Sequence, residues 1–195
     1  MMRRLRRRVG TLVLVVLTPF LVGAALLCPA GIAHATGTLL PQTDYTRNLD
    51  RIPDDTENAT AVDDTDGAEG TSDHLEPPAP GYAASDEYNL TDPGSSETAH
   101  SARAALCAKS LFNTPARAVV KPYKPNVGYL TPATVYLTFS YMLYTDIGSG
   151  IDDWDNTTWY ESHQDGARLW WKLIPYNIPL DYGDVAGDEV RLILC

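Results

Sequence analysis

Hydrophobic and polar residues alternate with a period of two in the C-terminal half of the chain. Between residues 134 and 144 the odd-numbered positions are apolar or aromatic, and the even-numbered positions are mainly Thr, Ser and Tyr. This period predicts one long β-strand with one buried face. The run from Arg168 to Ile174 predicts a second strand. Its two faces separate Leu169, Trp171 and Leu173, predicted inward, from Arg168, Trp170 and Lys172, predicted outward.

A third strand is expected over residues 189–195, and shorter strands over 117–121 and 157–161. Prolines interrupt every long window after residue 110, and a proline inside a helix costs about 3 kcal/mol. Only residues 101–110, which are rich in alanine, predict a short helix. Several short strands with glycine-containing turns between them predict a mainly β fold, as a small antiparallel sandwich or barrel.

The first 35 residues have the pattern of a signal peptide. Five arginines precede an apolar run over residues 11–28, and Ala33, His34 and Ala35 form a small-x-small cleavage site. We expect cleavage after Ala35 and a secreted, extracellular protein that keeps no membrane span. An uncleaved signal anchor, which would hold the chain at the cell surface, is the alternative.

Acidic residues concentrate in residues 36–100. This segment holds fifteen Asp and Glu residues against Arg47 and Arg51, and no apolar period is sustained along it. Such a composition predicts a disordered acidic tether, which serves as a solubilising spacer or as a tail that binds a basic partner. The strong negative charge argues against binding to nucleic acid or to an anionic membrane.

Cysteine spacing predicts one disulfide. If Cys28 leaves with the signal peptide, Cys107 and Cys195 remain. Export permits a bridge between them, which would enclose a single domain over residues 101–195. Two free thiols, or a Cys195 that pairs with a second chain, are the alternatives.

Three sequons make the protein a possible glycoprotein if its source glycosylates secreted chains. They begin at Asn58, Asn89 and Asn156, and none has proline at the middle position.

All four tryptophans fall between residues 154 and 171. One interpretation places Trp159 and Trp171 in the core, because aromatic side chains bury large areas in small β domains. A second has Trp154, Tyr160 and Trp170 exposed together on an aromatic loop that contacts a protein or a sugar.

The same stretch includes Asp152, Asp153 and Asp155. Closely spaced carboxylates suit calcium, a cation that prefers six to eight oxygen ligands, and these three are the calcium candidates. No other cofactor is expected. The stretch lacks the glycine and the terminal glutamate of an EF-hand loop.

The sequence contains no nucleophile elbow, zinc-protease motif, phosphate-binding loop or dinucleotide-binding turn. We therefore expect no enzyme but a secreted interaction module that contacts a host or cell-surface protein through its aromatic-rich loop. A carbohydrate-binding module, with or without calcium, is the alternative. A small secreted hydrolase using Glu161 and Asp165 is a further one.

Overall fold

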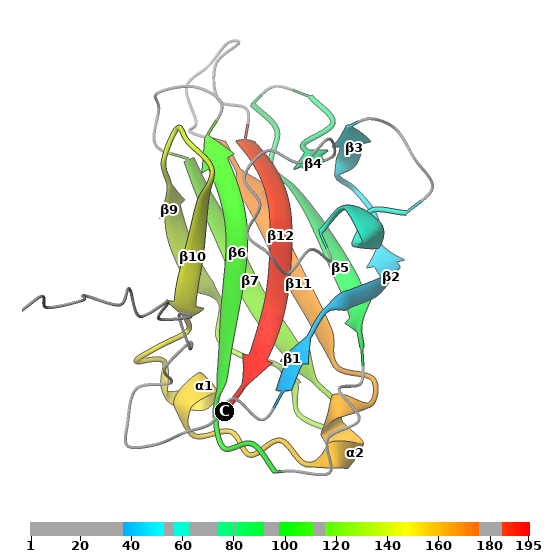
Figure 1. Cartoon of the computed structure of the whole chain (residues 1–195), viewed down its shortest axis with the longest axis vertical. Coiled ribbons are helices and arrows are strands. Elements are labelled where there is room, and N and C mark those ends of the chain that lie inside the picture. Colours follow the sequence, from blue (N-terminus) through cyan, green and yellow to red (C-terminus); the bar gives the residue numbers. More distant parts are fainter. Residues whose placement is uncertain are drawn as a thin grey trace, which may run out of the picture.

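The computed structural model describes residues 37–52, 57–62, 74–79, 81–91, 98–110, 116–175 and 185–195. These residues form two antiparallel β-sheets that pack face to face, with the sheet that contains β6 and β12 in front in Figure 1. The expectation of a mainly β antiparallel sandwich is confirmed. The predicted signal peptide lies outside the described residues. None of the described helices has the length and apolar composition needed to cross a bilayer.

The first sheet has six strands in the order β10-β6-β12-β4-β3, and β1 also pairs with β12. Its strands are β1 (Gly37–Leu39), β3 (Asp50–Ile52), β4 (His74–Glu76), β6 (Ala102–Ser110), β10 (Met142–Ile147) and β12 (Val185–Leu194).

The second sheet also has six strands, in the order β2-β5-β11-β7-β8, and β9 pairs with β7. Its strands are β2 (Pro41–Thr46), β5 (Ala84–Leu90), β7 (Ala116–Lys124), β8 (Gly128–Tyr129), β9 (Ala133–Leu137) and β11 (Arg168–Ile174). Three short helices complete the described elements: η1 (Ala59–Ala61), α1 (Asp152–Asp155) and α2 (Glu161–Gln164).

The predicted strand over residues 168–174 is confirmed as β11, and its inward face is the predicted one. Leu169, Trp171 and Leu173 are fully buried. The Trp171 ring reaches across the sandwich, since a Cβ built on Gly187 of β12 would lie 2.2 Å from it. A glycine at this position therefore lets the ring rest on the backbone of the opposite sheet.

Residues 102–110 form β6, an interior strand of the first sheet, so the helix predicted over residues 101–110 is wrong. β6 pairs with β10 on one side and with β12 on the other, which satisfies its backbone hydrogen bonds. Residues on both of its faces are buried. A strand buried on both faces is a continuous apolar run, and such a run cannot be distinguished from a helix by periodicity alone.

The predicted single strand over residues 134–144 is two strands, β9 and β10, in different sheets. β9 pairs with β7, whereas β10 pairs with β6. The corner between them is held by Tyr144, whose hydroxyl accepts a hydrogen bond from the Thr138 amide at 2.9 Å. Val135 and Leu137 of β9 face the core, but the alternation does not continue across the corner. In β10 Tyr144 packs against the core, whereas Phe139 and Leu143, predicted on the buried face, are exposed. The strand predicted over 157–161 is reduced to a bridge between Trp159 and Ala99.

The acidic segment over residues 36–100 is not a disordered tether where the structure describes it, because strands β1 to β5 lie within it. β1 pairs with the C-terminal strand β12, and β5 pairs with β11. The domain boundary expected near residue 101 therefore falls inside the sandwich. The composition of this segment did not predict the strands, because the strands with which β1 and β5 pair lie far away in the sequence.

Two carboxylates of this segment bind backbone donors. Asp44 accepts hydrogen bonds from the amides of Asn58 and Ala59, at 3.0 and 2.7 Å. Asp86 is buried and accepts the amides of Asn48 and Leu49, at 2.6 and 2.9 Å. These acids hold the loop after β2, and η1, against the sandwich.

The predicted disulfide between Cys107 and Cys195 is wrong, because Cys107 forms no disulfide. In the pairing of β6 with β12, Cys107 lies opposite Glu189, whereas the Cys195 amide donates to the carbonyl of Ser101. Six residues of strand separate Cys107 from Ser101, which is about 20 Å. A disulfide requires Cα atoms within about 7 Å.

We expect the buried Cys107 thiol to react with maleimide only after the chain unfolds, because the side chain is inaccessible in the native sandwich. Mass spectrometry after labelling with and without urea measures this. A peptide that links Cys107 to Cys195 in a non-reducing digest would contradict the described strand register.

Candidate functional site

The aromatic loop expected from the sequence does not assemble. Trp154 is fully buried, and its indole N–H donates to the carbonyl of Thr131 at 2.7 Å. Its ring covers Gly148, where a built Cβ would lie 2.0 Å from it. Trp154 is therefore a core residue, and the prediction that it is exposed beside Trp170 is wrong.

The other tryptophans separate into core and surface. Trp159 and Trp171 are fully buried, as the core interpretation expected. Trp170 lies on the outer face of β11 and is partly exposed. Tyr160 is exposed, but it precedes α2 and packs against His163 at a ring distance of 5.2 Å. Only Trp170, of the three predicted contact residues, belongs to a sheet face.

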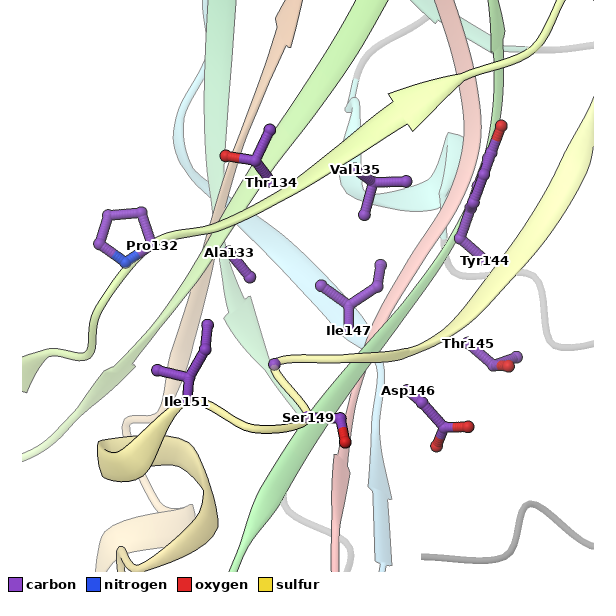
Figure 2. Close-up of a pocket in the computed structure, with 11 residues that line it drawn as sticks. Pro132, Ala133, Thr134, Val135, Tyr144, Thr145, Asp146, Ile147, Ser149 and Ile151 are labelled. Atoms are coloured by element: carbon purple, nitrogen blue, oxygen red, sulfur yellow. The ribbon is translucent and has the colours of Figure 1, made fainter. Parts of the chain in front are cut away.

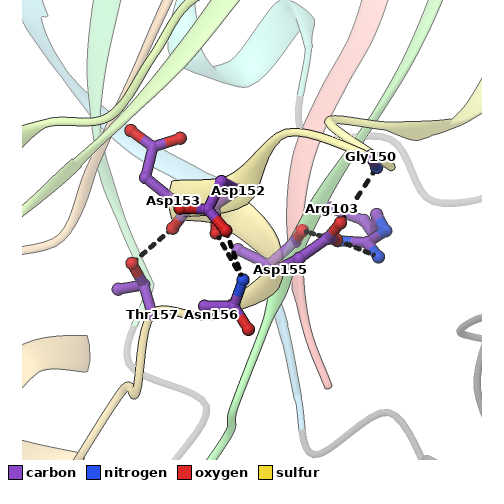
Figure 3. Close-up of polar contacts among 8 residues, drawn as sticks. Arg103, Gly150, Asp152, Asp153, Asp155, Asn156 and Thr157 are labelled. Carbon is purple, nitrogen blue, oxygen red and sulfur yellow. Dashed lines mark hydrogen bonds and ion pairs between the residues drawn. The ribbon is translucent and has the colours of Figure 1, made fainter.

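The three aspartates proposed for calcium are engaged in separate contacts, and Figure 3 shows those of the Asp152 and Asp155 carboxylates. Asp152 accepts from the side-chain amide of Asn156 at 2.7 Å, and Asp153 accepts from the Thr131 amide at 2.7 Å. Asp155 accepts from the Gly150 amide at 3.0 Å and pairs with Arg103 at 2.5 Å. Among the described residues, no group of three or more His, Cys, Asp and Glu side chains could hold a metal ion, and calcium at these aspartates stays a prediction.

The sequons differ in accessibility. Asn58 is fully buried, and its amide donates to the carbonyl of Leu49 and to Asp86, each at 2.7 Å. A glycan on that nitrogen is incompatible with this fold, so Asn58 is removed as a candidate. Asn89 is half-buried and donates to Thr43 at 3.0 Å, whereas Asn156 is exposed.

Glu161 and Asp165, the carboxylates considered for hydrolysis, are both exposed to solvent at the two ends of α2. His163 between them accepts a hydrogen bond from the Tyr160 amide at 3.3 Å. His163 therefore caps the first turn of α2.

A pocket of about 420 Å³ opens between β9 and β10, where the two sheets part (Figure 2). Val135 and Ile147 point toward each other across it, and Ile151 lines the side next to α1. Asp146 is the one carboxylate among its lining residues. The lining therefore combines apolar side chains with polar ones from Thr134, Tyr144, Thr145, Asp146 and Ser149.

The outer face of the second sheet has a different character. Alternation along β11 and β7 directs Arg168, Trp170, Lys121 and Tyr123 away from the core. In the strand register Trp170 lies level with Lys121, and Arg168 lies level with Tyr123. Tyr129 of β8 lies beside Tyr123. Strands that are distant in the sequence thus bring cations and aromatic rings together.

Cations stack on the rings of this face. The Lys121 ammonium lies 4.1 Å from the centre of the Tyr129 ring and 4.3 Å from that of Trp170. The Arg168 guanidinium lies 3.9 Å from the rings of both Tyr45 and Tyr123. Each contact of this kind contributes about 0.5–1 kcal/mol at an exposed site. We call Tyr45, Lys121, Tyr123, Tyr129, Arg168 and Trp170 the aromatic–cationic face.

Glu87 fixes the centre of the aromatic–cationic face. This buried carboxylate pairs with Arg168 at 3.1 Å and accepts a hydrogen bond from the Tyr129 hydroxyl at 2.7 Å. Burial, together with this hydrogen bond, raises the pKa of Tyr129 to about 12. The phenol therefore stays protonated at neutral pH and remains a donor to Glu87.

No family model and no curated protein matches the chain. Six chains among the solved structures match it. One of them, a carbohydrate-binding module described under "CBM4 structure and function", is 14% identical. The match covers 65% of this chain and 78% of that chain, with a TM-score of 0.30. At that TM-score the likeness carries no argument about binding.

Sequence reasoning found only part of the aromatic–cationic face. The outward placement of Arg168, Trp170 and Lys172 follows from the period of β11 and was predicted. Tyr45 and Glu87 come from the segment expected to be disordered. Their proximity to Arg168 depends on the pairing of β5 with β11, which no local pattern indicates.

Proposed function

We propose that this chain is a non-enzymatic binding module that acts outside the cell and contacts a protein partner through the aromatic–cationic face. The observation that carries the proposal is the set of exposed rings held by stacked cations on one sheet face. Trp, Tyr and Arg are the residue types that dominate the binding energy of protein interfaces.

The order already present in this face supports a binding role. Glu87 holds Arg168 and Tyr129, and the stacked cations restrict the rings before any partner arrives. Side chains that are ordered beforehand lose less conformational entropy on association. This arrangement favours affinity without requiring a deep cleft.

A protein partner suits the face better than a neutral sugar. A sugar binds an aromatic side chain by lying flat on the ring face, and Lys121 and Arg168 already cover one face of each of four rings. The edges of the exposed Tyr45 and Tyr129 rings stay available. Protein interfaces use these groups.

A non-enzymatic role is supported by the state of the candidate carboxylates. Glu161 and Asp165 face solvent, and Asp152, Asp153 and Asp155 are each engaged in contacts within the chain. The pocket between β9 and β10 offers a single carboxylate. General acid–base catalysis requires a donor and an acceptor placed together.

We expect Trp170→Ala to weaken binding of the protein partner by about 30-fold, the effect of a hot-spot tryptophan worth about 2 kcal/mol. The partner is first captured from extracellular proteins of the native source and identified by mass spectrometry. Its affinity for wild-type and variant chains is then measured by calorimetry with both proteins purified.

Tyr160→Ala is the matched control, because Tyr160 is an exposed aromatic residue at the N-cap of α2, outside the sheet face. We expect this variant to bind like the wild type. An equal loss in both variants would contradict the proposed location. A different result would identify a sugar as the ligand of this face. In that case the chain binds a glycan on an array, Trp170→Ala abolishes this binding, and no protein partner is captured.

A further inference from the structure

Basic residues gather on the outer face of β7 and β11 although the protein as a whole is acidic. The chain has a formal charge of -10. Arg117, Lys121, Arg168 and Lys172 nevertheless all point outward on these two strands. They are four of the ten Lys and Arg residues that follow residue 35. The charge of this face is opposite to that of the rest of the molecule.

The strand register arranges these cations in a zigzag. Arg168 lies level with Tyr123, Lys121 with Trp170, Lys172 with Val119, and Arg117 with Ile174. Successive cations therefore alternate between β11 and β7, and each is two residues further along the strands. Two residues of strand span about 7 Å, so the row of four extends about 20 Å.

Carboxylates do not balance this row. Glu87 is the only acid on the outward faces of β5, β7 and β11, and it is already paired with Arg168. Across the described residues Arg117, Lys121 and Lys172 have no ion pair with an acid. Three cations about 7 Å apart along the strands thus face solvent without a counter-charge.

We infer that the partner of this face is a protein segment in extended conformation, with acidic residues at every second position. The inference rests on the proposed function and names the chemistry of the partner for the same face. Side chains on one side of an extended strand recur at about 7 Å, which matches the spacing of the cations. A strand laid over a sheet runs within about 30° of the strands beneath it, which keeps this match along the row.

The side chains beside the cations favour a peptide over other polyanions. The apolar groups level with the cations, Trp170, Val119 and Ile174, offer contacts to the methylene groups of the acidic side chains that face the sheet. A polysaccharide of uniform acidic units presents no apolar side chains to them. Preferential binding of an acidic polysaccharide is therefore the alternative outcome of the experiment that follows.

The probe is a synthetic peptide of four Glu-Thr repeats, bound to the full chain and followed by fluorescence anisotropy. We expect saturable binding that weakens when the ionic strength is raised from about 50 mM to about 300 mM, because exposed charges are screened. A peptide of the same composition with its four glutamates adjacent is expected to bind less tightly. The Gln-Thr repeat is expected not to bind.

Lys172→Gln and Arg117→Gln test the row itself, and each is expected to lower the affinity for the Glu-Thr peptide about three-fold. Lys109→Gln is the matched control, because Lys109 lies on β6 in the first sheet and stacks on Tyr141. It removes one positive charge from the other side of the sandwich. We expect it to leave the affinity unchanged.

The outcomes separate this inference from the proposed function. If Trp170→Ala weakens binding of the captured partner while salt, Lys172→Gln and Arg117→Gln have no effect, the binding face stands and the acidic partner is wrong. Equal binding of the Gln-Thr peptide also overturns the inference. Tighter binding of polygalacturonate than of the Glu-Thr peptide assigns the row to an acidic polysaccharide instead.

Discussion

Replacement of Gly148 by alanine is expected to lower the free energy of unfolding by about 3 kcal/mol. Gly148 has a φ of +97°, a conformation that L side chains rarely adopt, and the new methyl carbon would lie 2.0 Å from the Trp154 ring. Relief of this overlap displaces a fully buried tryptophan and breaks its hydrogen bond to Thr131. Overpacking of this kind costs about 1–3 kcal/mol, and the backbone strain adds to it.

Gly150→Ala separates the two causes. Gly150 lies two residues away with a φ of +77°, but a Cβ there would meet nothing within 4 Å. We expect it to cost about 1 kcal/mol, from the backbone alone. Urea denaturation followed by tryptophan fluorescence measures both variants. Equal losses would show that the contact with Trp154 contributes nothing.

Asp86→Ala is expected to cost about 4 kcal/mol of unfolding free energy. The Asp86 carboxylate binds the amides of Asn48 and Leu49, the side-chain amide of Asn58 and the Tyr88 hydroxyl. Its removal leaves buried donors without an acceptor, and each such group costs about 1–3 kcal/mol where water cannot replace the partner.

The loss extends into the core, because Tyr88 also accepts a hydrogen bond from the Trp171 indole at 3.1 Å. Thermal unfolding followed by circular dichroism measures the effect. Asp50→Ala removes an exposed carboxylate from β3 and serves as the control. A melting temperature of Asp86→Ala equal to that of this control would mean that the buried network adds no stability.

The same network gives a pH dependence with a defined sign. Burial raises the pKa of Asp86 above its ordinary value of 3.8, against the opposing effect of its hydrogen bonds. The folded state then binds the proton more tightly than the unfolded state. This stabilisation is fully present below the unfolded pKa and is lost as the pH rises through the folded pKa.

Asp86→Asn does not titrate at this position and isolates the effect. The stability of the wild type relative to this variant is expected to fall as the pH rises from about 3 to about 7. Chemical denaturation at several pH values measures the difference. A difference that rises with pH would indicate a folded pKa below the ordinary one.

The errors of the sequence interpretation have physical causes that differ from element to element. Residues 101–110 were predicted helical because alanine favours helices, but pairing with β10 and β12 outweighs this small preference. Residues 36–100 were predicted disordered from their charge. Asp44 and Asp86 instead bind backbone donors, so their charges hold loops in place.

The cysteine prediction failed for a related reason, and the same reason separates the contacts of the aspartates. Neither the proximity of two residues in the sequence nor the chemical suitability of two side chains for a bond determines whether the side chains are in contact in the fold. Cys107 and Cys195 are on neighbouring strands but separated by six residues of register. The aspartates of α1 are adjacent in sequence, yet Asp153 and Asp155 contact different elements.

The sequence alone determined that the chain forms β-strands and which side of β11 faces the core. Period-two alternation is a local property, and it set Trp171 inward and Trp170 outward correctly. Only the tertiary structure decided that Trp154 is buried on Gly148 and that Arg168, Tyr45 and Glu87 meet on one face. Strand pairing joins residues far apart in the chain, and its free energy depends on contacts that no local pattern contains.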